Sequence, residues 1–294
     1  MSEKTHGRIL RMKYPASFVL SAFVLSACST VSPPPTPFTR AAASYDAKQS
    51  EIRNIAVIAD ACLIRDEGGS EDYWLINDSR TAGRHMLEGT AAYLKGKGYK
   101  VDFAEAPFVC AYKYGTGKMN AAADPGGQVS AKEPPLFEAE VLARDPAYRQ
   151  SLITLINATQ GAVKQVERSP SHVCCKTPPL KRDLDTVSKV TGGDAILFLV
   201  GDGVVVPEEK SVAQGVATGA ATAVMTLGLG SYAQWNVSYM DNYAALVDVE
   251  TGDILWGSSS RSKGCGLTDK GYYSDKWAPE ALSHLPSRTD PQSR

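Results

Sequence analysis

Thiols carry most of the chemistry that this sequence could perform. A cysteine sulfur can be acylated, oxidised to a disulfide or bound to a metal ion. The run His172-Val173-Cys174-Cys175 could supply part of a metal site, but it lacks the separated Cys-x-x-Cys pairs that are typical of structural zinc. We therefore expect no metal and no other cofactor, and we assign the thiols to covalent roles. The chain has six of them, Cys28, Cys62, Cys110, Cys174, Cys175 and Cys265.

The first cysteine stands at the end of a secretory signal. Basic residues come first, the apolar run Phe18–Leu25 follows, and small residues then lead into Cys28. The ending Leu25-Ser26-Ala27-Cys28 resembles the lipobox of bacterial lipoproteins, in which cleavage before the cysteine leaves a thiol that carries diacylglycerol. This resemblance implies that residues 1–27 are removed and that Cys28 is lipidated. An ordinary cleaved signal with a chance cysteine is the alternative, and Met12 is a second candidate start.

Lipid rather than a helix is expected to hold the chain at a membrane. The apolar run is about ten residues long, against the roughly 20 that a spanning helix needs. Several acyl chains such as palmitate on one cysteine anchor a protein stably, because each buried methylene contributes about 0.8 kcal/mol. Ser29 follows the cysteine where lipoproteins retained at the inner membrane often carry Asp. By that resemblance we expect the periplasmic face of the outer membrane rather than the inner membrane.

The five remaining cysteines predict disulfides. In an oxidising periplasm, five thiols give two disulfides and one free thiol as the simple outcome. Cys62 ends the first predicted strand and Cys110 follows the second, so parallel pairing of these strands would bring the two thiols close enough to bond. Cys265 would then pair with Cys174 or Cys175. The alternative is that some of these residues are buried thiols.

No catalytic motif is present. The sequence contains no Gly-x-Ser-x-Gly, no phosphate-binding loop and no His-Glu-x-x-His. His6 lies in the signal, and none of the other histidines (His85, His172 and His284) stands near a nucleophile pattern. Gly201-Asp202-Gly203 is expected to be a turn at a strand end, or a contact for a small ligand. We expect a protein that is not an enzyme, although a triad dispersed along the chain would leave no motif.

Composition indicates a globular protein behind a tether. The chain is 43% apolar and 21% charged with a formal net charge of −1, so no basic face is expected to bind nucleic acid. Pro33, Pro34, Pro35 and Pro37 favour an extended spacer, and we assign 28–50 to the lipidated cysteine and its tether. A single domain is expected over 51–286, with insertions at about 107–180 and 207–235. Residues 287–294 are expected to be a disordered tail.

The first elements predict a βαβ unit. The apolar run at 53–60 is typical of a buried strand. A helix with an amphipathic face is expected to begin at Ser79 or Asp78, and glycines end it at 96–98. The alternating residues 99–103 predict a second strand. Strand, helix and strand within about 50 residues favour parallel pairing and a right-handed crossover.

The remaining elements complete an α/β fold. Helices are expected over 136–167 and 183–190, a central apolar strand over 194–200 and a closing helix over 277–285. The strands expected at 237–249 and 254–259 are joined by a turn with Gly252 at a position that needs positive φ, which predicts an antiparallel hairpin. The predicted architecture is a mixed sheet, built from the βαβ unit and this hairpin and flanked by helices.

This hairpin resembles a recurring ending of periplasmic lipoproteins. Residues 244–256, Ala-Ala-Leu-Val-Asp-Val-Glu-Thr-Gly-Asp-Ile-Leu-Trp, are similar to the endings of curli-secretion lipoproteins, penicillin-binding-protein activator lipoproteins and a family of putative lipoproteins. The order of elements over 52–285 is also similar. The resemblance implies an anticodon-binding-like α/β domain with a non-catalytic role in an envelope machine. Thr251 and Gly252 are interpreted as turn residues, and Trp256 as a core residue.

A charge-free segment at 212–231 is the candidate contact region. Gly215 and Gly219 form a Gly-x-x-x-Gly pair, which permits close approach of helix backbones. The segment could be a buried helix, a surface for a partner or for self-association, or a membrane-inserting segment. Its many Gly and Thr residues argue against independent insertion. Met225 and Leu227 are the apolar side chains that we assign to the contact, together with the two glycines.

The sequence thus predicts a lipid-anchored periplasmic adaptor. Its expected role is the non-catalytic assembly or regulation of an envelope, secretion or cell-wall machine, with the membrane bound through Cys28 and an envelope protein or a second copy as partner. One alternative is a subunit of an oligomeric outer-membrane export channel. Another is a domain that binds a small ligand, for which a pocket with convergent polar groups would be required.

Overall fold

The computed structural model describes residues 38–42, 44–65, 73–107, 145–168, 181–206, 238–263 and 267–285. The chain divides into two compact units, Met1–Ser32 and Pro33–Arg294, and all the described residues belong to the second. Cys28 therefore lies outside the described residues.

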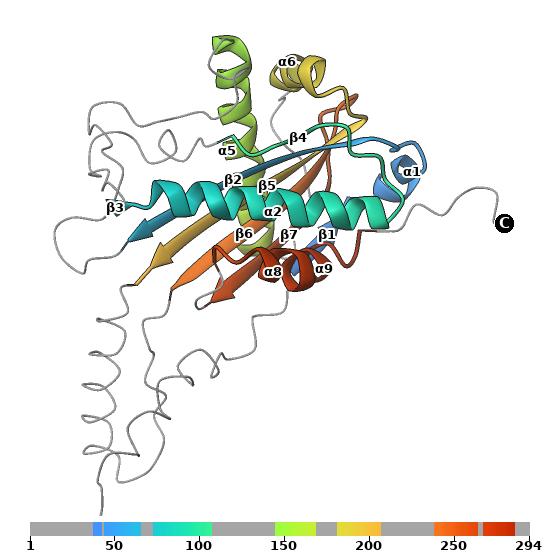
Figure 1. Cartoon of the computed structure of the whole chain (residues 1–294). Helices are drawn as coiled ribbons and strands as arrows, with labels where there is room; N and C mark the ends of the chain where they lie inside the picture. The colour runs from blue at the N-terminus through green and yellow to red at the C-terminus, as the bar shows by residue number, and fades with distance from the viewer. Residues whose placement is uncertain are drawn as a thin grey trace, which may run out of the picture. The chain divides into compact units, whose positions relative to one another are not determined.

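Strands and helices are interspersed along the chain, as in an α/β fold (Figure 1). The strands are β1 Phe38–Ala41, β2 Ile55–Arg65, β3 Tyr73–Trp74, β4 Ala104–Glu105, β5 Ala195–Val205, β6 Tyr239–Asp248 and β7 Ile254–Lys263. The helices are α1 Tyr45–Gln49, α2 Ile76–Gly96, α5 Pro146–Arg168, α6 Lys181–Thr191, α8 Lys270–Tyr272, the π-helical turn η1 Tyr273–Trp277 and α9 Ala278–Ala281.

The seven described strands form one mixed sheet in the order β1-β7-β6-β5-β2-β3, with β4 also paired to β2. β2 and β5 are parallel over their whole lengths, whereas β5, β6, β7 and β1 pair antiparallel in turn. The sheet therefore has two distinct ends. We call the end at the β6–β7 turn, residues 248–254, the turn end. We call the other end, at Val205, Tyr239 and Lys263, the polar end.

Alternation along the strands divides the core between two faces. One face packs under α2 and the C-terminal helices, and Figure 1 shows α2 lying along the sheet with α8 and α9 beside it. Its largest fully buried side chains are Trp256, Tyr273, Ile55, Leu63, Met86 and Leu94. The other face packs under α5 and α6, with Phe198, Ile58, Tyr148, Leu152 and Leu155 fully buried. The predicted α/β class, a mixed sheet flanked by helices, is confirmed.

The predicted βαβ unit is present, with three local differences. β4 is shorter and later than the expected strand at 99–103, although Lys100 forms an isolated parallel bridge with Asn54. β2 continues five residues beyond the expected end at Asp60, because β5 pairs with it as far as Arg65. The helix begins at Ile76 rather than at Ser79 or Asp78. Ser79 is buried, and its hydroxyl donates to the Leu75 carbonyl at 2.6 Å and accepts from the Leu63 amide at 2.9 Å.

Residues 38–42 and 44–50 belong to the fold, which corrects their assignment to the tether. β1 pairs with Trp256–Ser259 of β7, and the Ala42 amide donates to the Leu255 carbonyl at 2.8 Å. The α1 side chain of Tyr45 is only 3% exposed in the core under α2. The expected insertion at 107–180 is likewise part of the domain where it is described, because α5 covers one face of the sheet.

Gly201-Asp202-Gly203 lies inside β5 and is not the expected turn. Gly203 allows β6 to pass close by, since a Cβ atom there would stand 2.7 Å from the Tyr239 carbonyl oxygen. The closing helix begins at Lys270 rather than at Trp277 and includes the π-helical turn. At Gly203 and at the π-helical turn, two backbones approach too closely for a residue larger than glycine.

Candidate functional site

Four polar or ionisable residues form a transverse row at the polar end of the sheet. The strand register pairs Cys62 of β2 with Asp202 of β5, Asp202 with Asp241 of β6, and Asp241 with Arg261 of β7. Directly paired residues project from the same face of a sheet. This polar row lies on the face covered by α5, where the apolar core under α5 gives way to charge.

Helix α5 neutralises one member of the row. The Gln160 side-chain amide donates to Asp202 Oδ2, and the Lys164 ammonium nitrogen lies 3.3 Å from the same oxygen. The ammonium nitrogen also lies 4.7 Å from the centre of the Tyr243 ring, within cation–π range. Gln160 and Lys164 are four residues apart, so one face of α5 presents both to the strand. Sequence analysis missed this contact, for which the i, i+4 spacing was the available signal.

An arginine neutralises the next member. Arg261 donates to both carboxylate oxygens of Asp241, with Nη2 at 2.7 Å from Oδ2. The hydrogen bond to Asp241 raises the pKa of the guanidinium above its ordinary value. The guanidinium lies 4.7 Å from the centre of the Tyr239 ring. This bidentate geometry fixes the relative position of β6 and β7 more firmly than a single surface contact would.

The polar row stands at the base of the candidate contact segment. Residues 207–237 leave the sheet after β5 and return at β6, and the Val206 amide donates to the Ser238 hydroxyl at 3.0 Å across this base. β5 and β6 stay paired up to Val204 and Tyr239. Asp202 lies four residues before Val206 and Asp241 lies three residues after Ser238, so both ion pairs are close to that closure. The arrangement holds both ends of the segment at one place on a rigid sheet.

The ionisable side chains at this base are paired with one another. Both carboxylates of the row are engaged by cations, and no group of three or more His, Cys, Asp or Glu side chains among the described residues could hold a metal ion. His85 Nδ1 lies 2.9 Å from the Thr268 carbonyl oxygen, away from the row on α2, and His284 is exposed near the C-terminal end of the fold. No helix in the described ranges is long and apolar enough to span a bilayer.

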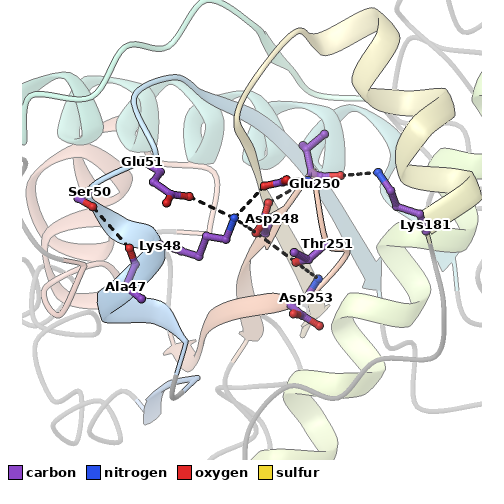
Figure 2. A network of polar contacts seen from close by, with 10 residues as sticks. Ala47, Lys48, Ser50, Glu51, Lys181, Asp248, Glu250, Thr251 and Asp253 are labelled. Atoms are coloured by element: carbon purple, nitrogen blue, oxygen red, sulfur yellow. Dashed lines mark hydrogen bonds and ion pairs between the residues drawn. The ribbon is translucent and has the colours of Figure 1, made fainter.

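A second polar network lies at the turn end (Figure 2). The Lys48 ammonium of α1 reaches three carboxylates, at 2.8 Å from Glu250, 3.1 Å from Glu51 and 3.7 Å from Asp248. Lys181 of α6 donates to the Val249 carbonyl at 3.1 Å from the other side of the turn. The network holds the N-terminal residues and α6 against the β6–β7 turn.

The turn itself has the chemistry that the sequence predicts. Asp248 accepts from the Glu250 amide at 2.9 Å through Oδ1 and from the Thr251 hydroxyl at 3.1 Å through Oδ2. Gly252 has a φ of +81°, which an L side chain rarely adopts. Thr251 and Gly252 are therefore turn residues, and Trp256 is a core residue with an exposed fraction of 0%.

Of the predicted site residues, only Cys62 lies in the described part of the chain. It is 1% exposed within the polar row, and it is disulfide-bonded. The other cysteines fall outside the described residues, as do Gly215, Gly219, Met225 and Leu227 of the contact segment. The pairing of Cys62 with Cys110 stays a prediction. Peptide mapping by mass spectrometry without reduction would test it, and a peptide joining Cys62 to another cysteine would contradict it.

A half-buried carboxyl on β4, opposite Ile58 of β2, gives a pH-dependent prediction. Burial raises the pKa of Glu105, and its Oε2 atom has no hydrogen-bond partner among the described residues. Between the ordinary value of 4.5 and the raised pKa, the folded protein holds a proton that the unfolded chain has released, so stability falls as pH rises through this window. We expect Glu105→Gln to remove this fall and to raise the melting temperature at neutral pH, measured by thermal unfolding from pH 4 to 8.

Glu250 supplies a control with the opposite sign. Hydrogen bonding to Lys48 lowers the pKa of Glu250, so its stabilising contribution is present above the ordinary carboxyl pKa and is lost as pH falls through the lowered one. Glu250→Gln should therefore lower the melting temperature at neutral pH and have no effect at the acid end. Melting curves in which both variants shift in the same direction at pH 7 would contradict this assignment.

The fold and the polar row define the chain as an α/β domain with a mixed seven-stranded sheet. No known family and no curated protein matches the sequence. Two solved structures of PelC from Paraburkholderia phytofirmans, both dodecamers, are similar to it. A point variant of PelC is 10% identical with a TM-score of 0.32, and the alignment covers 86% of this chain and 99% of that one. A second PelC structure is 9% identical with a TM-score of 0.30, covering 84% and 96%. Neither likeness is close enough to define a family.

Proposed function

We propose that this chain is a lipid-anchored periplasmic lipoprotein that acts as a non-catalytic adaptor or regulator of an envelope assembly, secretion or cell-wall machine. Cys28 carries the lipid, and the segment 212–231 makes the contact with the partner. The observation that carries the proposal is the closed base of this segment. Val206 and Ser238 are hydrogen-bonded, and ion pairs fix the strands on either side.

A rigid base suits a binding segment better than a linker. Interaction residues are disproportionately carried on loops that a rigid scaffold positions. The segment between Val206 and Ser238 is 31 residues long, beyond the length of an ordinary connection within a compact domain. Its 212–231 portion contains no charged residue, which favours contact with an apolar surface.

The paired charges of the polar row support a positioning role. A general base needs a free acceptor near its working pH, whereas Asp202 and Asp241 each accept hydrogen bonds from cationic or amide donors. These contacts restrain strands and leave the presentation of a surface as the function that the geometry supports best.

Two changes test the proposal. Cys28→Ala should abolish incorporation of a palmitate analogue and release the protein from the outer-membrane fraction. Replacement of 212–231 by a Gly/Ser segment of the same length should abolish capture of a specific envelope protein while leaving the thermal unfolding of the domain unchanged. The matched control replaces only 287–294 and should retain capture.

The outcomes separate the proposal from its alternatives. Absence of acyl label on the wild-type chain would remove the lipoprotein assignment. Retained capture after the Gly/Ser replacement would remove 212–231 as the contact. If the chain lacking residues 1–28 formed large rings in native mass spectrometry and stayed in membranes, an export-channel subunit would replace the adaptor.

A further inference from the structure

The N-terminal residues are fixed against one edge of the sheet. We call residues 38–42 and 44–50, which include β1 and α1, the N-terminal clasp. Three contacts hold it, namely the pairing of β1 with β7, the burial of Tyr45 under α2 and the ion pairs of Lys48 with the β6–β7 turn. These contacts therefore fix the position of Phe38, where the clasp begins, on the sheet.

The register shows from which direction that chain arrives. Phe38 pairs with Ser259 and Ala41 pairs with Trp256, so β1 runs towards the turn end. Along an antiparallel pair, residue numbers rise on one strand as they fall on the other. The first residue of β1 therefore lies on the side of Ser260 and Lys263, which is the polar end of the sheet. The connection 207–237 leaves and returns at the same end, at Val206 and Ser238.

We propose that the polar end of the sheet faces the lipid surface to which the chain is anchored. This inference rests on the lipidation of Cys28 in the proposed function. Nine residues, 29–37, separate Cys28 from the clasp, so the arm between the two Cα atoms spans at most about 36 Å. With four prolines the arm favours an extended conformation near 31 Å.

In the opposite orientation, almost the whole length of the arm would be needed to reach the turn end. Eight residues separate Ser259 from Thr251 at the turn, which is about 27 Å along a strand, whereas four residues or about 14 Å separate Ser259 from Lys263. If the turn end faced the bilayer, the arm would have to run back along the domain for most of its length. The short arm therefore turns the polar end towards the membrane.

This orientation assigns a direction to each end of the sheet. Val206 and Ser238, which lie at the polar end, face the bilayer. The α6 helix and the β6–β7 turn, which lie at the other end, face away from it. A tether of the length that the sequence predicts, ending at residue 50, would have imposed no such orientation.

Distance-dependent quenching tests the orientation directly. The lipidated full chain would be reconstituted in phosphatidylethanolamine/phosphatidylglycerol vesicles that contain a headgroup-linked quencher. A fluorescent amino acid would replace either Val206 at the polar end or Lys189, which is exposed on α6 near the turn end. Because the two ends are about 30 Å apart along the strands, we expect quenching at Val206 to exceed that at Lys189 by about twofold or more.

A longer arm provides the control. Insertion of 20 Gly/Ser residues between Ser32 and Pro33 leaves the clasp intact but frees the domain to rotate, and we expect the difference between the two positions to disappear. Equal quenching in the wild-type chain, or stronger quenching at Lys189, would overturn the inference while leaving the lipid anchor in place. Absence of acylation would overturn both the anchor and the inference, and metabolic labelling identifies that case separately.

Discussion

Trp256→Ala is expected to lower the free energy of unfolding by about 3–5 kcal/mol, because it removes a large, fully buried aromatic side chain and leaves a cavity. Trp256 lies on β7 between Ala41 of β1 and Leu246 of β6, in the core under α2. Urea unfolding of the chain lacking residues 1–28 measures the change. The midpoint should fall while the dependence on urea stays the same.

Trp256→Phe separates packing from recognition. The indole Nε1 atom is buried and has no hydrogen-bond partner among the described residues, so a phenyl ring keeps most of the packing and loses no hydrogen bond. We expect a much smaller loss of stability for Phe than for Ala. If Trp256→Ala unfolded like the wild type yet lost capture of an envelope protein, Trp256 would be a contact residue and its place in the core would be wrong.

The parts of the fold that sequence could predict are those with strong local patterns. The apolar runs of β2 and β5 and the Asp248–Asp253 turn carry their own signals, because buried strands and tight turns restrict residue type. Strand ends were less predictable. β5 continues through Gly201-Asp202-Gly203, since β2 and β6 on either side keep the ladder intact where a local pattern indicates a turn.

The N-terminal clasp could not be predicted, because its stability is entirely tertiary. Among the described strands, the four-residue strand Phe38–Ala41 pairs only with β7, and α1 is too short to form on its own. Tyr45 buries its ring against residues far along the chain. Lys48 meets Glu250 across 202 positions of sequence. No short stretch of sequence contains both partners of any of these contacts, so the local pattern predicts a tether here.

The candidate site shows the same division. Asp202, Lys164 and Arg261 are ordinary charged residues in the sequence, and only the register of four strands and the packing of α5 bring their partners to them. Cys62 was identified from its residue type alone. Val206 and Ser238 are far apart in sequence yet are hydrogen-bonded at one end of the sheet, which the sequence does not reveal.

Gly89→Ala is expected to destabilise the domain by about 1–3 kcal/mol, although alanine favours a helix by about 1 kcal/mol over glycine. Gly89 lies in α2 where the backbone of the π-helical turn crosses it. A Cβ atom there would stand 2.8 Å from the Tyr273 carbonyl oxygen and 2.9 Å from its carbonyl carbon. Backbone atoms cannot move aside as a flexible side chain could, so α2 and η1 must separate. The urea midpoint measures the loss.

Gly96 is the matched control in the same helix. A Cβ atom at Gly96 meets no atom within 4 Å, so Gly96→Ala should leave stability unchanged or raise it by up to about 1 kcal/mol. The two substitutions are chemically identical and differ only in what faces them, so their difference isolates the close approach at Tyr273. A stabilising effect at both positions would show that η1 does not pack on α2 as closely as this, and the widened turn would then need another explanation than the fit between these two backbones.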